Sequence, residues 1–168
     1  MMSEDGLEAV RSGLPAQLAS LWRYGIVLSR HRQTAEDLVQ ATCVRALERG
    51  AQFTAGTRLD RWLFAIMRSI WLNDLRAARV RQGGGLVDAD DVLVFDGIAN
   101  TETNILARQV LSEVQKLPEA QRETVFLVYA EGMSYAEAAQ ALSIPIGTVM
   151  SRLAAARAKL AGLGGDGV

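Results

Sequence analysis

Residues 133–160 have the sequence MSYAEAAQALSIPIGTVMSRLAAARAKL, in which two short helical patterns meet at a Ser-Ile-Pro corner. The first pattern is rich in alanine, whose small side chain lets a crossing helix approach closely. Pro145 lies at the corner and presets the backbone for the start of the second helix. On an ideal helix of about 100° per residue, the apolar residues of the second pattern fall on one face. These residues are Val149, Leu153, Ala156 and Leu160. The stretch therefore predicts two crossing helices, the second of which packs through that face.

The opposite side of the second helix carries mostly polar residues: Thr148, Ser151, Arg152, Ala155 and Lys159. Such a pair of helices is a helix-turn-helix when the second helix presents its N-terminal half to the major groove of DNA. In that case Thr148, Ser151 and Arg152 would contact bases, and Lys159 would reach a phosphate. The alternative is a hairpin of two helices with a solvated polar face. The spacing alone does not separate these two interpretations. The charge does not separate them either, because residues 105–168 balance six basic against six acidic residues.

Helical periodicity dominates the rest of the chain, and the alternation typical of strands is nearly absent. The expected helices are 15–30, 34–49, 59–81, 102–116, 119–130, 134–141 and 146–161. Residues 83–101 hold three consecutive glycines and an acidic run, which indicates a flexible linker. We therefore expect an all-α fold in which two small helical domains, 14–82 and 102–161, are joined by this acidic linker. Residues 1–13 and 162–168 are expected to be tails.

The net charge of −1 hides an uneven distribution of charge along the chain. Residues 14–82 hold eleven arginines against five acidic residues, whereas residues 83–104 hold five acidic residues and no basic one. The local field around the first domain is therefore positive although the average is nearly neutral. This distribution favours a negatively charged partner, such as a nucleic acid, for the first domain.

Part of the positive charge is ordered along the predicted helix in RLDRWLFAIMRSIWLNDLRAARVR, residues 58–81. Four arginines of this helix lie within about 80° of one another on an ideal helix: Arg61, Arg68, Arg76 and Arg79. Such a stripe is typical of a surface that follows a phosphate backbone, with a solvated face as the alternative. We expect no acid to neutralise it, since Asp60 and Asp74 lie to its side. Phe64 and Trp71 would either stack on unpaired bases or pack in the core, and we favour the core for tryptophan.

Three segments, together with the gap between the last two, carry a resemblance to a known family. They are AEDLVQATCVRAL (35–47), RLDRWLFAIMRSIWLNDLR (58–76) and LPEAQRETVFLVYAEGMSYAEAAQALSIPIGTVMSRL (117–153). In this order and spacing they resemble the sigma-70 family, specifically the small extracytoplasmic-function (ECF) sigma factors of bacterial RNA polymerase. The resemblance covers about residues 14–160. It implies an alternative sigma factor that binds core polymerase and directs promoter-specific initiation, with a sigma-2 type domain, a linker and a sigma-4 type domain that contains the helix-turn-helix.

The resemblance also implies roles for individual residues. In the family, the helix equivalent to 35–47 docks on the clamp helices of the polymerase β′ subunit, which assigns core binding to Asp37, Leu38 and Gln40. Residues 52–58 and the following helix correspond to the elements that capture a flipped base and read the −10 promoter element. The DNA-binding residues implied there are Arg61, Arg68, Ser69, Arg76 and Arg79. The helix-turn-helix corresponds to the reader of the −35 element, with Thr148, Ser151, Arg152 and Lys159 as its contacts.

Two departures and two further partners belong to the same resemblance. Many family members carry Asn where this chain has Ser69, and a basic residue where it has Ala155. The first departure alters the −10 preference, and the second removes one contact to the −35 element. The implied partners are the polymerase β flap and an anti-sigma factor that holds the protein inactive. The acidic linker corresponds to the family's linker in the polymerase channels, although a solvated tether explains its charge equally well.

Other features exclude several classes of protein. The chain has no apolar run long enough to cross a membrane, and residues 1–15 lack a signal-peptide core. Cys43 is the only cysteine, which leaves no intramolecular disulfide and favours the cytoplasm. His31 has no catalytic companions, and the glycines at 83–85 lack the lysine of a phosphate-binding loop. We therefore expect no enzyme activity, no metal and no cofactor.

Two rival functions stay open at this point. One is a sigma mimic that keeps the fold and sequesters an anti-sigma factor, which the neutral second domain and Ala155 favour. The other is a conventional helix-turn-helix regulator, which the clamp-type segment at 35–47 disfavours. Run-off transcription with core polymerase would separate both from a sigma factor, because only a sigma factor initiates from a promoter.

Overall fold

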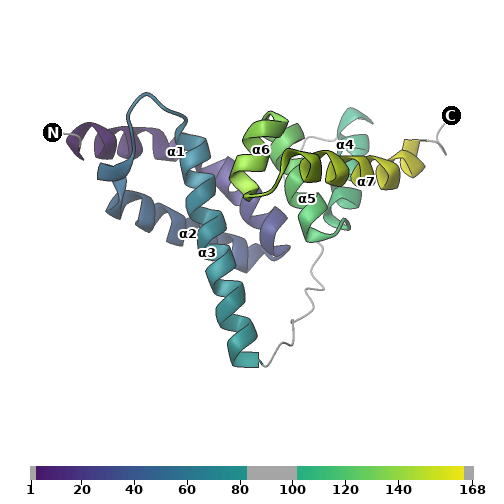
Figure 1. Cartoon of the computed structure of the whole chain (residues 1–168), viewed down its shortest axis with the longest axis horizontal. Coiled ribbons are helices and arrows are strands. Elements are labelled where there is room, and N and C mark those ends of the chain that lie inside the picture. The colour runs from purple at the N-terminus through teal and green to yellow at the C-terminus, as the bar shows by residue number, and fades with distance from the viewer. Residues whose placement is uncertain (1–2, 83–101, 165–168) are drawn as a thin grey trace. The chain divides into compact units, whose positions relative to one another are not determined.

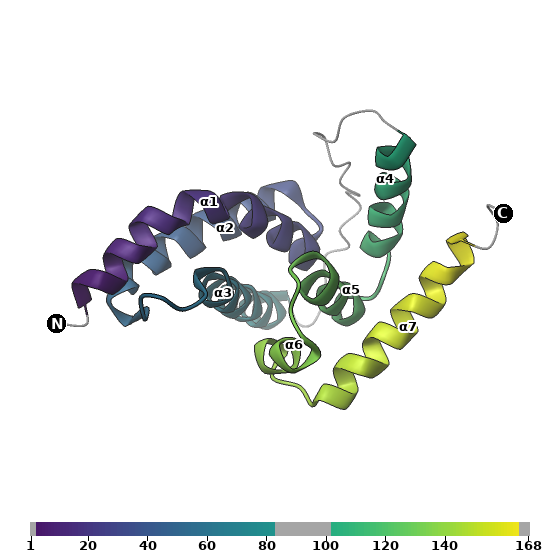
Figure 2. The same cartoon turned by 90° about the horizontal axis from the view of Figure 1, so that it is seen from above.

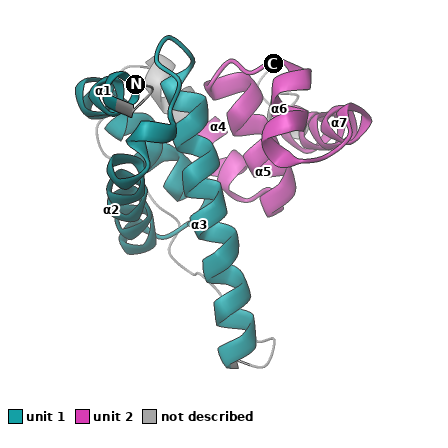
Figure 3. Cartoon of the chain, turned by 60° about the vertical axis from the view of Figure 1, so that its left-hand side comes forward, with its two compact units in different colours: residues 1–91 teal, residues 92–168 magenta. Residues whose placement is uncertain are grey.

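The computed structural model describes residues 3–82 and 102–164, and every regular element in those residues is a helix. The chain divides into two compact units, residues 1–91 and 92–168, which Figure 3 shows in different colours. The prediction of an all-α fold with two small helical domains is therefore confirmed. The linker expected at 83–101 lies outside the described residues.

The first unit is built from three long helices and a short 3-10 turn (Figure 1). Its elements are α1 (Ser3–Ser29), α2 (Arg32–Glu48), η1 (Gly50–Gln52) and α3 (Leu59–Gln82). α1 and α2 run side by side, and α3 packs against both (Figure 2). The largest fully buried side chains of this core are Val10, Leu21, Tyr24, Ile26, Leu28, Leu38, Leu63 and Met67. Burial of apolar side chains from all three helices stabilises the unit.

Residues 3–13 form the first part of α1, so the expectation that residues 1–13 are a tail is wrong. α1 begins at Ser3 and carries Pro15 inside the helix. Val10 and Leu14 are buried, which anchors this first part to the rest of the unit. Glycine and proline are the poorest helix formers, and their presence argued against a helix before residue 15. Tertiary contacts stabilise the helix there despite them.

Two glycines of α1 lie in close contact with a neighbouring segment, Gly6 with no room for a side chain and Gly25 with little. A Cβ on Gly6 would overlap the carbonyl oxygen of Phe53 and lie 2.6 Å from that of Gly50. A Cβ on Gly25 would lie 3.1 Å from the Cα of Ala35 in α2. α1 therefore approaches η1 near its beginning and α2 near its end, each time through a glycine.

The second unit contains α4 (Glu102–Gln115), α5 (Glu119–Val125), η2 (Phe126–Ala130), α6 (Tyr135–Leu142) and α7 (Ile146–Gly164). The helix predicted at 119–130 is α5 followed directly by η2, which is π-helical. α7 packs against both α5 and α6. The tail expected at 162–168 begins as the last turn of α7, which continues to Gly164.

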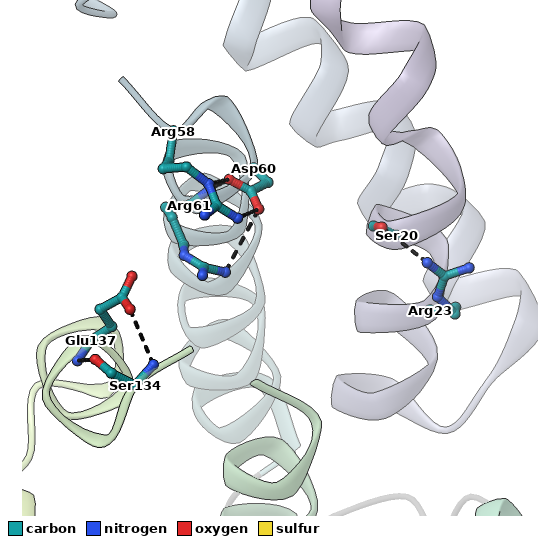
Figure 4. A network of polar contacts seen from close by, with 7 residues as sticks. All are labelled: Ser20, Arg23, Arg58, Asp60, Arg61, Ser134 and Glu137. Atoms are coloured by element: carbon teal, nitrogen blue, oxygen red, sulfur yellow. Dashed lines mark hydrogen bonds and ion pairs between the residues drawn. The ribbon is translucent and has the colours of Figure 1, made fainter. Parts of the chain in front are cut away.

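The start of α6 is fixed by a capping box (Figure 4). The Ser134 side chain accepts a hydrogen bond from the backbone N–H of Glu137 at 3.0 Å, and the Glu137 carboxylate accepts one from the N–H of Ser134 at 3.1 Å. Two backbone donors of the first helical turn are thereby satisfied. The sequence therefore defines where the first helix of the helix-turn-helix begins.

The corner between α6 and α7 follows from two residues. Ser143 adopts the left-handed conformation, with φ 55°, and ends α6. The carbonyl oxygen of Pro145 then accepts a hydrogen bond from the N–H of Thr148 at 3.0 Å, as α7 starts. The apolar face predicted for α7 is confirmed by burial at Val149, Leu153 and Ala156, while Leu160 is half-buried.

Candidate functional site

The outward face of α2 carries two of the three residues predicted to bind a partner. Asp37 and Gln40 are exposed, and the Gln33 Nε2 donates a hydrogen bond to Asp37 Oδ1 at 3.0 Å. Leu38 is only 2% exposed and belongs to the core of the first unit. Its predicted role as a contact is therefore corrected: Leu38 anchors α2, whereas Asp37 and Gln40 face the solvent.

A shallow hollow follows the exposed face of α2, along positions three to four residues apart. It is lined by Asp37, Gln40, Ala41, Val44, Arg45 and Glu48. Val44 is 55% exposed, and Leu47 beside it is also exposed. Val44 was not among the predicted contacts, although its spacing from Gln40 was the signal, since residues four apart share a helix face. The surface combines an apolar centre with polar ends, which suits docking of another protein.

The loop between α2 and α3 is held at its first end by aromatic packing. Phe53, which directly follows η1, is 4% exposed. Its ring centroid lies 5.1 Å from that of Trp62 in α3. The residues beyond it, 54–58, are all exposed. The loop therefore has a buried base and an open tip.

The tip of this loop has a defined turn. The Thr57 Oγ1 and the Thr57 N–H both donate hydrogen bonds to the Thr54 carbonyl oxygen, at 2.6 and 3.2 Å. Gly56 has φ +89°, a conformation that side chains rarely adopt. These features give an exposed loop with a fixed shape.

The second end of the loop is held by charged side chains (Figure 4). Arg58 donates two hydrogen bonds to the Asp60 carboxylate, at 3.0 and 2.7 Å, and the Arg61 guanidinium lies 3.6 Å from the same group. Partial burial raises the pKa of Asp60, but the hydrogen bonds from Arg58 and Arg61 and their charges outweigh it, so this pKa is lowered. The expectation that no acid neutralises the arginine stripe is therefore wrong at its first member.

The remaining residues of the stripe lie along the rest of α3. Arg68 is half-buried, whereas Arg76 and Arg79 are exposed, as is the predicted contact Ser69, which is not part of the stripe. Arg81 adds a further exposed positive charge near the end of α3. The exposed positive charge of this stripe is thus concentrated in the C-terminal half of α3. Such a surface suits the phosphate backbone of a nucleic acid.

The aromatic side chains of α3 divide between the core and its edge. Phe64 is buried and contacts Tyr24 edge-to-face, with centroids 5.1 Å apart. Trp62 and Trp71 are half-buried. Phe64 is therefore unavailable for stacking on a base, and of the two stacking candidates only Trp71 keeps an exposed edge.

In the second unit, the residues predicted to contact the −35 element differ in exposure along α7. Ser151 and Lys159 are exposed, whereas Thr148 and Arg152 are half-buried. The Ser151 hydroxyl donates to the Gly147 carbonyl oxygen at 3.0 Å, so its oxygen can still accept. All four residues lie outside the buried face, and only the half-burial of two of them was unexpected.

The start of α7 exposes apolar side chains that the sequence analysis did not single out. Met150 is 52% exposed, and Ile146 is 49% exposed. With Gly147 and Ser151 they form the open side of the first two turns. In a major groove, apolar side chains contact the methyl group of thymine.

Arg157 of α7 makes polar contacts with tyrosines of η2 and α6 in the second unit. The Arg157 Nη1 of α7 donates to the Tyr129 hydroxyl of η2 at 3.0 Å. Hydrogen bonds with Tyr135 of α6 and with Tyr129 raise the pKa of Arg157 above its ordinary value. This contact helps to hold α7 against η2 and α6, and no periodicity in the sequence pointed to it.

Residues 3–82 and 102–164 were also compared with what a membrane span or a metal site requires. No helix there is both long and apolar enough to cross a membrane. Those residues contain no cluster of three His, Cys, Asp or Glu side chains able to hold a metal ion. Cys43 is half-buried, and burial raises the pKa of its thiol.

Comparison with known proteins gives matches to both units. The family model for sigma-70 region 2 matches residues 11–81, and that for sigma-70 region 4 matches residues 107–160. The ECF RNA polymerase sigma factor EcfG of Rhodopseudomonas palustris is 34% identical over 158 residues, which cover 93% of this chain and 85% of that protein. The ECF RNA polymerase sigma factor SigC of Mycobacterium tuberculosis is 31% identical over 149 residues, or 89% of this chain and 80% of that protein.

A solved structure is similar as well. It is the sigma factor RpoE of Bartonella quintana in complex with the anti-sigma factor NepR. The match has a TM-score of 0.75 and 28% sequence identity, and covers 91% of this chain and 94% of the other. Each of the two matched family segments falls within one compact unit of the fold.

Proposed function

This chain belongs to the ECF group of the sigma-70 family. We propose that the exposed face of α2 binds polymerase and that the exposed faces of α3 and α7 bind promoter DNA. It is an alternative RNA polymerase sigma factor, which binds core polymerase and directs promoter-specific initiation of transcription. The observation that carries the proposal is that regions 2 and 4 form separate helical units, each with its own exposed polar surface.

We assign polymerase binding to the hollow on α2. Asp37 and Gln40 supply polar contacts, and Val44 supplies the apolar centre that a protein interface needs. Leu38 supports this surface from below, because it fixes α2 on the core. The partner proposed for the hollow is the clamp of the β′ subunit, and the β flap is the partner proposed for the second unit.

We assign the −10 element to the loop 50–58 and to α3. The exposed tip of the loop receives an unpaired base, while Arg76 and Arg79 follow the DNA backbone. Ser69 is exposed on the same helix, and we assign it to the base that is read. Extrusion of a base costs a few kcal/mol, which a preformed loop helps to offset. Arg61 and Arg68, being half-buried, shape this surface and reach the DNA only at its edge.

We assign the −35 element to α7. Ser151 and Met150 face the bases, Thr148 and Arg152 approach from the side, and Lys159 reaches a phosphate. Because Ala155 provides no charge, this surface binds DNA weakly by itself. It gains effective affinity inside the holoenzyme, where the polymerase holds it near the promoter.

We further propose that an anti-sigma factor regulates this protein, since the similar RpoE and CnrH structures are complexes with NepR and with the cytosolic domain of CnrY. The place of action is the cytoplasm, where the polymerase works. The protein acts through binding and has no catalytic step of its own.

Run-off transcription with purified core polymerase tests the proposed function. Templates from a genomic promoter library are transcribed by core alone and by core with this protein, and the transcript starts are mapped. We expect new starts that share two sequence elements at a fixed spacing. A chain that binds core or an anti-sigma factor but never produces a start would instead be a mimic, and a chain that binds DNA without core would be a conventional regulator.

A further inference from the structure

The first turns of α1 and the short turn η1 touch through their backbones. A Cβ on Gly6 would overlap the carbonyl oxygen of Phe53, and a Cβ on Gly50 would lie 2.6 Å from Leu7 Cδ1 and 3.0 Å from Leu7 Cα. Each side thus presents a glycine to the other. A side chain on either side would force the two segments apart.

Phe53 transmits this contact to α3. Its carbonyl oxygen faces Gly6 of α1, while its buried ring lies against Trp62, one turn into α3. The base of the loop is therefore confined between α1 on one side and α3 on the other. A displacement of the start of α1 has to move Phe53, and with it the exposed residues 54–58.

We propose that residues 3–13 of α1 are a positioning element of the −10 reader, which holds the loop 50–58 in the shape that receives an unpaired base. Gly6 and Leu7 are its positioning residues, which contact Gly50 and the Phe53 carbonyl oxygen at the base of the loop. The inference rests on the proposed function, because it concerns the same loop. Its physical basis is preorganisation: a site fixed before binding spends less of its interaction energy on ordering itself.

The same helix supplies a matched control. Gly25 is also a close-contact glycine of α1, but it faces Ala35 of α2 and not the loop. Gly6→Ala and Gly25→Ala are the same chemical change in one helix, and both disturb packing. Only Gly6→Ala acts on the base of the loop. If Gly6 contributed only to stability, loop exchange and base preference would change in both variants in proportion to the loss of Tm.

The first arm of the experiment measures hydrogen exchange of the backbone amides in the full-length protein. We expect Gly6→Ala to speed exchange in residues 50–58 relative to Gly25→Ala, and Gly25→Ala to act instead on the part of α2 around Ala35. Leu7→Ala removes a side chain instead of adding one, and we expect it to act in the same direction. It keeps the test valid if Gly6→Ala does not fold. Equal exchange of the loop in all variants would overturn the inference.

The second arm measures initiation by the holoenzyme on promoters that differ in one base of the −10 element. We expect Gly6→Ala to lower the ratio of initiation on the preferred base to that on the other bases by about tenfold, since small displacements of a positioned group have large effects on rate. Gly25→Ala should keep the wild-type ratio. Faster exchange of the loop with an unchanged ratio in Gly6→Ala would also overturn the inference.

Failure of the proposed function gives a different result. In that case the wild type itself would initiate without any base preference in the −10 element, or would not initiate. The loop would then not be the reader, and the positioning role would fall with it, whatever the exchange arm shows. If the wild type and Gly6→Ala discriminate between bases equally well, the inference is overturned and the proposed function stands.

Discussion

At the scale of single residues, Asp60 connects the loop 50–58 to α3. One carboxylate accepts two hydrogen bonds from Arg58 and lies close to Arg61. It also accepts a hydrogen bond from the backbone N–H of Arg61 at 2.9 Å, within the first turn of α3. An acid in the first turn is favourable because the helix dipole is positive there. Asp60 thus orders the end of the loop and the start of the helix together.

The lowered pKa of Asp60 predicts a dependence of stability on pH. Because the folded pKa lies below the ordinary value of 3.8, the carboxylate stabilises the fold above that value, and this contribution is lost as the pH falls through the folded pKa. We expect Asp60→Asn to have a lower Tm than the wild type near neutral pH, and the two to converge in acid. Asp74→Asn, at an exposed position of α3, is the control and should track the wild type. A deficit in Asp60→Asn that stays constant into strong acid would contradict this assignment.

Arg152 tests the −35 assignment at a single position. We expect Arg152→Glu to lower the preference for promoters with an intact −35 element by about tenfold or more, since a contact to a base edge contributes a few kcal/mol. Binding to core polymerase, measured by fluorescence anisotropy, should be nearly unchanged. Lys116→Glu reverses a charge at the end of α4 and serves as the control. Loss of both promoter preference and core binding in Arg152→Glu would mean that Arg152 supports the fold.

At the scale of elements, α2 is a helix with one face for the core and one for a partner. Leu38 and Thr42 face inward, and the Thr42 hydroxyl donates to the Leu38 carbonyl oxygen at 2.6 Å. Asp37, Gln40 and Val44 face outward. The two faces follow from the helical period alone, so a change on the outward face should affect binding and leave folding intact.

Val44 is the sharpest test of that face. We expect Val44→Asp to weaken binding of core polymerase by about tenfold or more, because a buried, unpaired charge at the centre of an interface is costly. The Tm should stay close to that of the wild type, since the side chain is largely exposed. Leu18→Asp is the matched control, because Leu18 is an apolar residue of α1 that is also exposed, at 42%. Equal losses in the two variants would place the polymerase contact elsewhere.

The capping box of α6 gives a prediction for stability. We expect Ser134→Ala to destabilise the second unit by about 1 kcal/mol, because the N–H of Glu137 loses its acceptor. Thermal unfolding monitored by circular dichroism measures this change. Ser12→Ala, inside α1, is the control and should be neutral or slightly stabilising, since alanine is the better helix former. A neutral Ser134→Ala would show that the cap contributes nothing to the start of α6.

The sequence predicted the helix-turn-helix well and α1 poorly, for physical reasons that differ. The buried face of α7 repeats with the helical period, and Pro145 marks its start, so both are local signals. The first part of α1 depends on a contact with η1 that joins residues far apart in sequence, and Gly6 and Pro15 argue locally against a helix. Leu38 was predicted beside Asp37 as a contact, but adjacent residues of a helix lie about 100° apart, and Leu38 faces the core.

At the scale of the whole molecule, the uneven charge matches the division of work. The unit with the surplus of arginines is the one assigned to melted DNA, where phosphates are contacted and bases are unpaired. The neutral unit is the one assigned to duplex DNA, through the small polar and apolar surface of α7. We expect neither unit to bind a promoter by itself, so that promoter binding requires the polymerase. A regulator that covers the polymerase-binding face would therefore also prevent promoter binding.

Footprinting of one promoter complex tests the central claim most directly. Core polymerase and this protein are bound to a promoter found by run-off transcription, and the complex is probed with DNase I and with permanganate, which oxidises unpaired thymines. We predict protection of the −35 element together with reactive thymines in the −10 element, and loss of both when core polymerase is left out. A complex that forms with core yet shows neither protection at −35 nor unpaired thymines at −10 would contradict the assignment of the two units to promoter recognition and opening.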